Sequence, residues 1–140
     1  MAQGICFEDL KLGDTASTGK TITEADVLLF SAVSSDTNPV HLNAEAAAAS
    51  VFKHRVAHGM LTAGLISAVL GTRLPGPGSI YLSQTLQFRA PVAIGDTVTA
   101  TVEVTGLDTE RKRATLRTIC TVAGRTVIDG EAVVIPPLRG

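Results

Sequence analysis

The sequence predicts an α+β fold in which one antiparallel sheet curls around a buried helix. Two patterns carry this prediction. Residues 60–74 are apolar on nearly every side of a helix, and a helix without a polar face must be buried on all sides. After residue 75 apolar and polar side chains alternate, which is typical of antiparallel strands with one face on the core. Such a sheet and such a helix bury each other's apolar surface if the sheet curls around the helix.

Two helices are predicted ahead of the buried one. Thr23 can cap the first, because Asp26 stands at the reciprocal position of a capping box, and this helix should end near Ser34. Asn43 can cap a second, short helix over residues 44–51. Both helices therefore precede the segment that leads into the core.

The remaining elements follow from helix breakers and from periodicity. Residues 52–59 have the composition of a loop, the buried helix is expected over about residues 59–72, and the stretch LPGPGS ends it. Alternation with period two then predicts strands at residues 80–88, 97–105, 113–122 and 125–135. In the first of these strands one face of the sheet should be shared by Ile80, Leu82, Leu86 and Phe88.

Length and composition limit the domain organisation and the partners. The chain has 140 residues, the usual size of one domain, and 45% of them are apolar, so we expect a single domain over residues 1–140. The net charge is −1 and the 12 Lys and Arg residues are scattered, so no nucleic-acid partner is expected. The longest apolar window, residues 60–70, is too short to span a bilayer, so no membrane partner is expected either.

The two cysteines and the N-terminus indicate the compartment. Cys6 and Cys120 form no CxxC pair and lie in ordinary apolar surroundings, so we expect reduced thiols without a functional role. The N-terminal stretch has neither a charged start nor a long apolar run, unlike a signal peptide. These features predict a cytoplasmic protein.

The stretch DTNPVH places a carboxylate and an imidazole on either side of a stiff turn. Pro39 fixes its own φ and pushes Asn38 toward extended geometry, and Asn38 can hydrogen-bond its own backbone. A rigid turn is what a positioned acid–base pair requires, so Asp36 and His41 can aim at one water and move its protons. The plain structural alternative is a helix-ending aspartate and a half-buried surface histidine. That alternative is commoner for this spacing alone, and the rigid turn is what favours catalysis.

The stretch AHGM stands where the loop enters the buried helix. The first N–H groups of a helix have no internal partner and carry partial positive charge, and Gly59 lets a ligand approach them closely. Such a helix end can stabilise a developing oxyanion, for example on a thioester carbonyl. The alternative is that Gly59 only makes a tight entry into a crowded helix and that His58 is a capping or core histidine.

Two further patterns could indicate a metal site or a serine nucleophile, but each lacks a feature that such a site requires. His54 and His58 are four residues apart, but they precede the helix and no glutamate stands between them, so no metal site is expected from them and His41. Ser67 is a polar residue on an apolar helix, and no GxSxG surrounds it, which argues against a serine nucleophile. Most such hydroxyls bond back to the helix carbonyl four residues earlier, and the alternative is that Ser67 lines a pocket near Gly59.

Four stretches of the chain resemble one known family. They are FSAVSSDTNPVHLNAEAAAAS, VAHGMLTAGLISAVLG, PGPGSIYLSQTLQFRAPVAIGDTV and GEAVV, and the resemblance covers residues 7 to 136. They are similar to the MaoC-like, (R)-specific enoyl-CoA hydratases, the hydratase-2 family, and to its short members that feed polyhydroxyalkanoate synthesis. One departure is visible, because Ser35 stands where the family usually has glycine before the aspartate.

The resemblance implies a fold, a reaction and an assembly. It implies a hot-dog fold, in which an antiparallel sheet wraps a long central helix, and a homodimer whose sheets join edge to edge near the active site. It implies (R)-specific syn hydration of trans-2-enoyl-CoA without any cofactor besides the CoA of the substrate. It also implies residue roles. Asp36 and His41 would form a catalytic dyad, the Gly59 N–H would bind the thioester, and Ser67 and Leu70 would belong to the acyl pocket.

Two other classes of function remain open on the sequence. A thioesterase of the same fold would hydrolyse the thioester, and such enzymes typically carry a lone carboxylate on or near the central helix. Here the central helix has no carboxylate, and the aspartate has a histidine nearby. A non-catalytic acyl-CoA-binding module is opposed only by the intact Asp–His pair.

Overall fold

The computed structural model describes residues 3–140 and confirms the α+β prediction. A six-stranded antiparallel sheet has the order β1-β4-β5-β6-β2, and β3 pairs with β6. The strands are β1 (Thr15–Thr21), β2 (Ile80–Gln84), β3 (Gln87–Phe88), β4 (Thr97–Asp108), β5 (Arg113–Val122) and β6 (Arg125–Ile135). The helices are α1 (Glu24–Ser34), α2 (Pro39–Leu42), α3 (Ala44–Ala48) and α4 (Gly59–Thr72), with a 3-10 turn at Phe7–Asp9.

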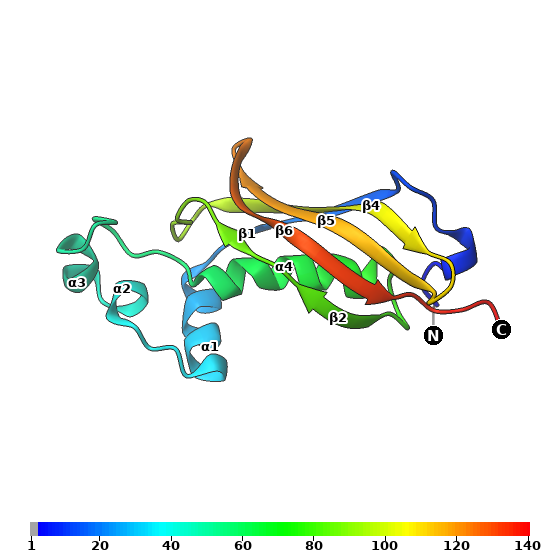
Figure 1. Ribbon diagram of the computed structural model, residues 1–140. Coiled ribbons are helices and arrows are strands. Elements are labelled where there is room, and N and C mark those ends of the chain that lie inside the picture. The colour runs from blue at the N-terminus through cyan, green and yellow to red at the C-terminus, as the bar shows by residue number, and fades with distance from the viewer. Residues whose placement is uncertain (1–2) are drawn as a thin grey trace.

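The elements form two regions (Figure 1). The sheet lies across α4, and the shorter helices α1, α2 and α3 lie beyond one end of the sheet, away from the two chain termini. The chain from α3 back to α4 therefore returns along the helical region, and the start of α4 lies where the two regions meet.

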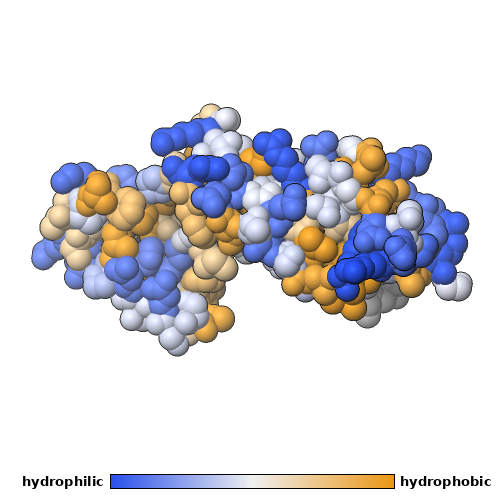
Figure 2. All heavy atoms as spheres, in the orientation of Figure 1, coloured by the Kyte–Doolittle hydropathy of each residue, from blue (hydrophilic) through white to orange (hydrophobic). Residues whose placement is uncertain are grey.

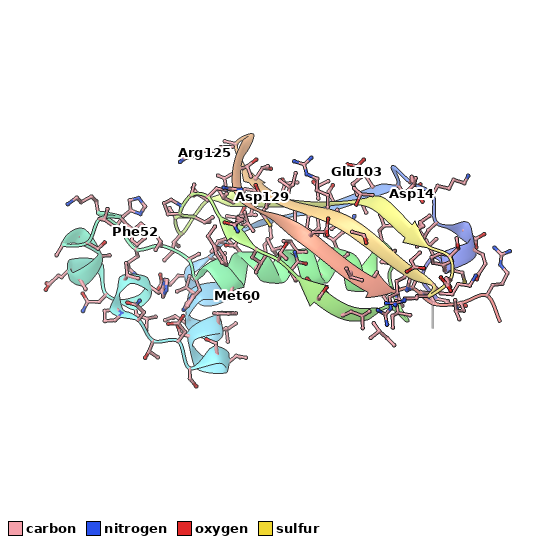
Figure 3. All side chains as sticks on the ribbon, viewed as in Figure 1. Asp14, Phe52, Met60, Glu103, Arg125 and Asp129 are labelled. Atoms are coloured by element: carbon pink, nitrogen blue, oxygen red, sulfur yellow. The ribbon has the colours of Figure 1, made fainter. Side chains whose placement is uncertain are left out.

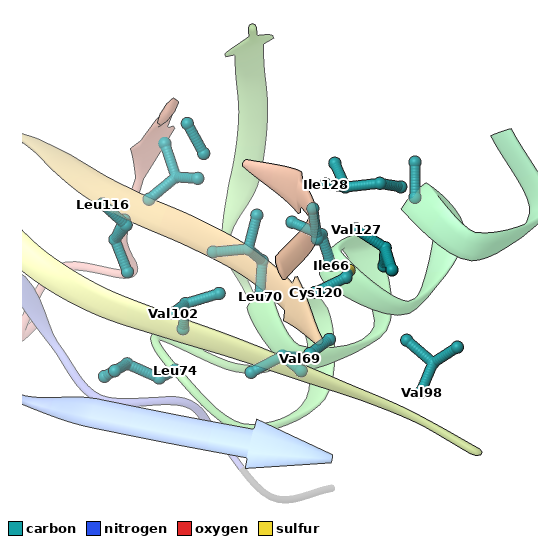
Figure 4. Close-up of a cluster of buried hydrophobic side chains, with 14 of the residues drawn as sticks. Ile66, Val69, Leu70, Leu74, Val98, Val102, Leu116, Cys120, Val127 and Ile128 are labelled. Atoms are coloured by element: carbon teal, nitrogen blue, oxygen red, sulfur yellow. The ribbon is translucent and has the colours of Figure 1, made fainter. Parts of the chain in front are cut away.

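The core lies between the inner face of the sheet and one side of α4 (Figure 4). Alternate residues of β4 point inward, and its register with β5 sets Ala100 opposite Cys120 and Val104 opposite Leu116. Each large side chain buried in this way contributes about 1.5–3 kcal/mol to stability. The labelled core side chains include Ile66, Val69, Leu70, Val98, Val102 and Leu116.

The expectation that the central helix is buried on all sides is wrong for this chain. Ile66 and Val69 are 0% exposed, but Met60 is 56% exposed. The sheet covers one side of α4, and no other layer within residues 3–140 covers the opposite side. The uncovered face of α4 consists of the exposed residues Met60, Gly64, Ser67, Ala68, Gly71 and Thr72.

The predicted strand over residues 80–88 is two strands, β2 and β3, with a break at Thr85. The Thr85 carbonyl oxygen lies so close to Gly130 of β6 that a Cβ there would meet it at 1.8 Å, and the Thr85 N–H donates to the Glu131 carbonyl. The shared-face expectation also fails, because β2 has an irregular register between Tyr81 and Ser83. Only Leu86 of the four named side chains is partly buried, whereas Ile80, Leu82 and Phe88 are exposed. Figure 2 shows apolar atoms along the lower edge of the sheet, where β2 runs.

Two elements are absent from the sequence-based expectation. β1 pairs along its whole length with β4, although its residues TASTGKT show no apolar alternation. α2 occupies part of the expected turn, with Pro39 as its first residue, and α3 ends earlier than expected, at Ala48. Within residues 3–140 no helix combines the length and the apolar character needed to cross a membrane.

Candidate active site

Asp36 lies in the connection between α1 and α2. Ser35 ends α1 in the left-handed conformation (φ 65°), which glycine adopts most easily. The Asp36 Oδ1 accepts a hydrogen bond from the Asn38 N–H (3.3 Å), and Asn38 Oδ1 accepts one from the Val40 N–H (3.2 Å). The turn thus uses one carboxylate oxygen of Asp36, and no hydrogen bond within residues 3–140 uses the other.

His41 is held by its ring and by its backbone. The ring is 8% exposed, and its Nδ1 lies 2.7 Å from the Val56 carbonyl oxygen. Because a carbonyl only accepts hydrogen bonds, Nδ1 carries the hydrogen, and the neutral ring keeps its lone pair on Nε2. The His41 carbonyl accepts from Arg55 Nε (2.7 Å), and Arg55 forms an ion pair with Glu24 of α1 (2.9 Å).

His58 is packed against both predicted catalytic residues. Its ring stacks on that of His41, with 3.9 Å between centroids and 24° between planes. Its Nε2 lies 3.0 Å from the Asp36 carbonyl oxygen and 3.0 Å from Ser31 Oγ. The sequence suggested a capping or core histidine, and His58 is indeed buried at the start of α4, but its contact with Asp36 was not anticipated.

Gly59 is the first residue of α4, and its neighbour in space is Phe88 of β3. A Cβ at Gly59 would lie 2.6 Å from the Phe88 ring, so only glycine allows this ring to pack where it does. The His58 carbonyl accepts the N–H groups of Leu61 and Thr62, and no hydrogen bond within residues 3–140 uses the N–H of Gly59. This N–H is a free donor at the positive end of the helix dipole.

These groups surround one hollow of about 560 Å³. Its polar lining includes Asp36, Asn38, His41, His58 and Gly59, so the structure brings the predicted dyad and the predicted anion-binding glycine together. Apolar side chains form much of the rest, among them Phe52, which follows α3, and Met60 on α4 (Figure 3). A carboxylate, an imidazole lone pair and a helix N–H can therefore reach a single small substrate.

The predicted acyl-pocket residues lie elsewhere. Ser67 lines a second hollow of about 440 Å³ between α4 and β2, together with Tyr81 and Leu82. Met60 lines both hollows, so it stands between them. Leu70 is 2% exposed within the core and lines neither hollow, because it faces the sheet.

Asp36, His41 and His58 are of residue types that also bind metals, and they offer ligand atoms within 4.8 Å of one another. Both rings already spend one nitrogen on a carbonyl, which leaves His41 Nε2 and His58 Nδ1 as lone-pair donors. His58 Nδ1 is buried without a hydrogen-bond partner. His41 Nδ1 and His58 Nε2, which donate to carbonyls, cannot also coordinate an ion, so each ring could offer a metal only its other nitrogen.

A sheet wrapped over one helix, with a carboxylate, an imidazole and a free helix N–H around one hollow, is the arrangement of the hot-dog fold. The chain belongs to the MaoC-like family, because the family described as "MaoC like domain" matches residues 11–129. Comparison with solved structures confirms the hot-dog fold. The unliganded R-hydratase from Pseudomonas aeruginosa superposes with a TM-score of 0.93 at 46% identity, covering 98% of this chain and 88% of that chain.

Other relatives are similar over nearly their whole length. The chain is 64% identical over 134 residues to the (R)-specific enoyl-CoA hydratase of Rhodospirillum rubrum, covering 96% of this chain and 93% of the relative. It is 55% identical to the 3-hydroxybutyryl-CoA dehydratase of Methylorubrum extorquens, with coverages of 95% and 85%. The (R)-hydratase of A. caviae involved in PHA biosynthesis superposes with a TM-score of 0.90 at 46% identity, covering 93% and 99%.

Proposed function

We propose that this chain catalyses the reversible, (R)-specific hydration of trans-2-enoyl-CoA to (R)-3-hydroxyacyl-CoA. The observation that carries the proposal is the convergence of Asp36, His41 Nε2 and the Gly59 N–H on one hollow. The named activities of the two similar relatives, a hydratase and a 3-hydroxybutyryl-CoA dehydratase, are the two directions of one reaction and support it.

In the proposed mechanism one water is held between the Asp36 carboxylate and His41 Nε2. The dyad takes a proton from this water as its oxygen bonds to C3 of the enoyl thioester. The electron pair of the alkene moves toward the thioester oxygen, and the Gly59 N–H stabilises the negative charge that forms there. The dyad then returns a proton to C2, and the addition is syn because one water supplies both pieces to the same face.

The substrate carries the only coenzyme that this reaction needs. A syn hydration adds the oxygen and a proton of one water across the alkene without a change of oxidation state that a cofactor must supply, so we propose that the enzyme uses no metal and no cofactor besides the CoA of the substrate. The apolar side chains of the hollow suit an acyl chain, and Ser67, which lines the second hollow, remains our proposal for a residue that shapes the acyl site. Leu70 lies in the core and lines neither hollow, so we do not assign it to the acyl site. The relative from A. caviae involved in PHA biosynthesis suggests the polyhydroxyalkanoate route as the pathway.

We also propose a homodimer. β2 is an edge strand with an open side, and Ile80, Tyr81 and Leu82 on it are 41–57% exposed. An exposed apolar edge strand invites pairing with another chain. The uncovered face of α4 lies beside this strand across the second hollow, so a second copy of the chain can cover both at once.

A hot-dog thioesterase is the second candidate function. The residues of α4 include no aspartate or glutamate that would serve as the lone carboxylate typical of such enzymes. The Asp36 carboxylate instead lies beside two histidine rings. An acyl-CoA-binding module without catalysis is the third candidate, and it makes no use of the free lone pair on His41.

One spectrophotometric experiment separates these functions. Hydration removes the absorbance of the conjugated thioester of crotonyl-CoA, hydrolysis releases a free thiol, and a binding module does neither. We expect loss of absorbance without thiol release, and Asp36→Asn and His41→Gln should each lower kcat by about 10²–10⁴-fold with the fold retained. The double variant should be little worse than the poorer single variant, because the two residues act as one unit.

The matched control is His54→Gln. His54 is an exposed histidine on the loop after α3, and it lines neither hollow, so this variant should keep normal turnover. Dialysis against a chelator should also leave kcat unchanged. Near-normal turnover by Asp36→Asn would show that the dyad assignment is wrong.

A further inference from the structure

His58 joins the parts of the proposed site that come from different elements. Its ring lies between Phe30 of α1, at 4.8 Å between centroids, and His41 of α2, at 3.9 Å. Its Nε2 lies 3.0 Å from the backbone carbonyl of Asp36, in the connection between those helices. Its own backbone caps α4, and the next residue is Gly59. One residue therefore contacts the carboxylate turn, the imidazole and the helix end.

The hydrogen bonds fix the form of this ring. The Asp36 carbonyl can only accept, so the hydrogen of the neutral His58 ring is on Nε2, and Ser31 Oγ shares the same donor. His58 Nδ1 is buried and has no hydrogen-bond partner within residues 3–140. The ring of His58 thus acts as a donor through Nε2.

The two histidines therefore have opposite tautomers. His41 keeps its hydrogen on Nδ1 and presents the Nε2 lone pair, whereas His58 keeps its hydrogen on Nε2 and spends it on the backbone. His58 is 2% exposed, so it is poorly placed to exchange protons with a substrate. Its contacts instead restrict where the Asp36 turn can lie relative to α4.

We propose that His58 is a positioning residue that fixes the Asp36 turn to the start of α4 through its Nε2–H, so that the carboxylate and the Gly59 N–H keep one relative geometry. This inference rests on the proposed hydratase mechanism. The hydrogen bond from the His58 Nε2–H to the Asp36 carbonyl is part-buried, so without His58 the turn loses a contact that holds it against the start of α4 and is free to shift. A displacement of about 1 Å at a catalytic group can cost on the order of 10²-fold in rate.

Two substitutions separate the donor from the ring. His58→Phe keeps an aromatic ring for stacking and removes the donor, whereas His58→Gln keeps an N–H donor near the Nε2 position and removes the ring. We expect His58→Phe to lower kcat on crotonyl-CoA by on the order of 10²-fold with KM changed less than about threefold. His58→Gln should recover at least about tenfold of that loss. The control is His54→Phe, a histidine replaced on the exposed loop, which should turn over normally.

The outcomes decide the proposal as follows. Normal kcat in His58→Phe, or a His58→Gln variant that is no more active than a folded His58→Phe, would overturn it. Thermal unfolding of each variant identifies loss of fold. If His58→Phe does not fold, an NMR measurement on the ring nitrogens of the wild-type protein tests the proposal instead. Their ¹⁵N shifts should show the Nε2–H form for His58, and an Nδ1–H form would overturn the proposal.

The nitrogen shifts also keep this proposal distinct from the proposed function. They report the His58 hydrogen bond whatever reaction the protein catalyses. If the wild-type protein does not hydrate crotonyl-CoA, the proposed function fails while the Nε2–H form is still observed. If it does hydrate crotonyl-CoA and His58 has the Nδ1–H form, only the positioning role fails.

Discussion

Each residue of the proposed site uses one group for structure and leaves another free for the proposed chemistry. Asp36 gives Oδ1 to the turn and keeps Oδ2, and His41 gives Nδ1 to the Val56 carbonyl and keeps Nε2. Gly59 gives its Cα surface to the Phe88 ring and keeps its N–H. Groups held in this way lose little freedom when the substrate binds, which is the basis of a high effective concentration.

The Phe88 contact leads to a prediction about Gly59. In Gly59→Ala the added Cβ would lie 2.6–2.8 Å from two Phe88 ring atoms, so this ring, which lines the first hollow, must shift. Phe88 is 54% exposed, so the ring can move without loss of the fold. We expect kcat on crotonyl-CoA to fall by roughly 10–10²-fold, in the range of a lost or blocked oxyanion donor.

Two variants check the cause of that loss. Gly71→Ala adds the same methyl group to the same helix where nothing lies within 4 Å, and it should keep normal activity. Gly59→Ala combined with Phe88→Ala should recover part of the lost kcat because the clash is gone. A double variant as poor as Gly59→Ala alone would contradict the ring-shift explanation.

Burial makes one of the two cysteines unreactive. Cys120 is 0% exposed in β5, and burial raises the pKa of its thiol to about 11. Only the thiolate reacts with alkylating reagents, so Cys120 should not be modified at pH 8 in the folded protein. We expect mass spectrometry after iodoacetamide treatment to find label on Cys120 only when denaturant is present, and activity to be kept without it.

At the scale of elements, α1 is fixed by the capping box that its sequence predicted. Thr23 Oγ1 accepts from the Asp26 N–H (3.1 Å) and Asp26 Oδ2 accepts from the Thr23 N–H (2.9 Å). The Thr23 N–H, together with Lys20 at 3.0 Å, lowers the pKa of Asp26 below its ordinary value of 3.8. Since α1 carries Ser31 and leads into the Asp36 turn, this cap also supports the site.

The sign of the pKa shift sets the pH dependence of an Asp26→Asn variant. A carboxylate with a lowered pKa in the folded state adds stability above its unfolded pKa, and this stability is lost as pH falls through the folded value. At pH 6.5 we expect the wild type to be more stable than Asp26→Asn by about 1 kcal/mol, the usual cost of a weakened cap. Urea unfolding should show this difference shrinking below about pH 4, and a difference that grows there would contradict the assignment.

The two faces of α4 give a prediction from neighbouring residues. Ile66 is 0% exposed against the sheet, whereas Ser67 is exposed on the uncovered face. Ile66→Asp would bury an unpaired carboxylate, so we expect no cooperative unfolding transition in circular dichroism. Ser67→Asp should still fold as a control, and a folded Ile66→Asp would contradict the position of the core.

The elements that the sequence predicted well are those with the strongest periodic burial. The bounds of β5 and β6 agree with the predicted strands 113–122 and 125–135, because most of their buried residues are apolar, with Thr118 as a polar exception. β1 has no such pattern, since it is an edge strand of small and polar residues held by backbone pairing with β4. The break at Thr85 depends on Gly130, which is distant in sequence, so no local pattern around residue 85 reveals it.

The contacts of the site also divide into those that a local sequence pattern predicts and those that it does not. The turn from Asp36 to His41 is local, so its Asx-type hydrogen bond at Asn38 could be predicted and is confirmed. The contact of His58 with Asp36 joins residues 22 positions apart, and only the packing of α1 and α2 against α4 brings them together. Neither the alternation of strands nor the period of a helix carries that information.

At the scale of the whole molecule, a single chain leaves apolar surface uncovered on one side. Tyr81 and Leu82 of β2 and Met60 of α4 are 41–56% exposed, and they line the second hollow together. Because Met60 also lines the first hollow, a molecule that covers this side will affect the acyl end of the proposed site. With the proposed dimer, we therefore expect assembly and substrate range to be linked.

The proposed homodimer is tested by placing a charge on this surface. Leu82→Lys puts an ammonium group on β2, where pairing with a second copy would bury it, and charged side chains on an edge strand oppose such pairing. We expect sedimentation at micromolar concentration to give a dimer for the wild type and a folded monomer for Leu82→Lys. The matched control is Val33→Lys on α1, a residue that is 84% exposed and lies outside both hollows, and it should remain a dimer.

The kcat/KM of Leu82→Lys should fall more for long enoyl-CoAs than for crotonyl-CoA, because only a long acyl chain extends past Met60. A wild-type monomer at these concentrations would refute the dimer, and equal losses for short and long substrates would refute the link between assembly and acyl length.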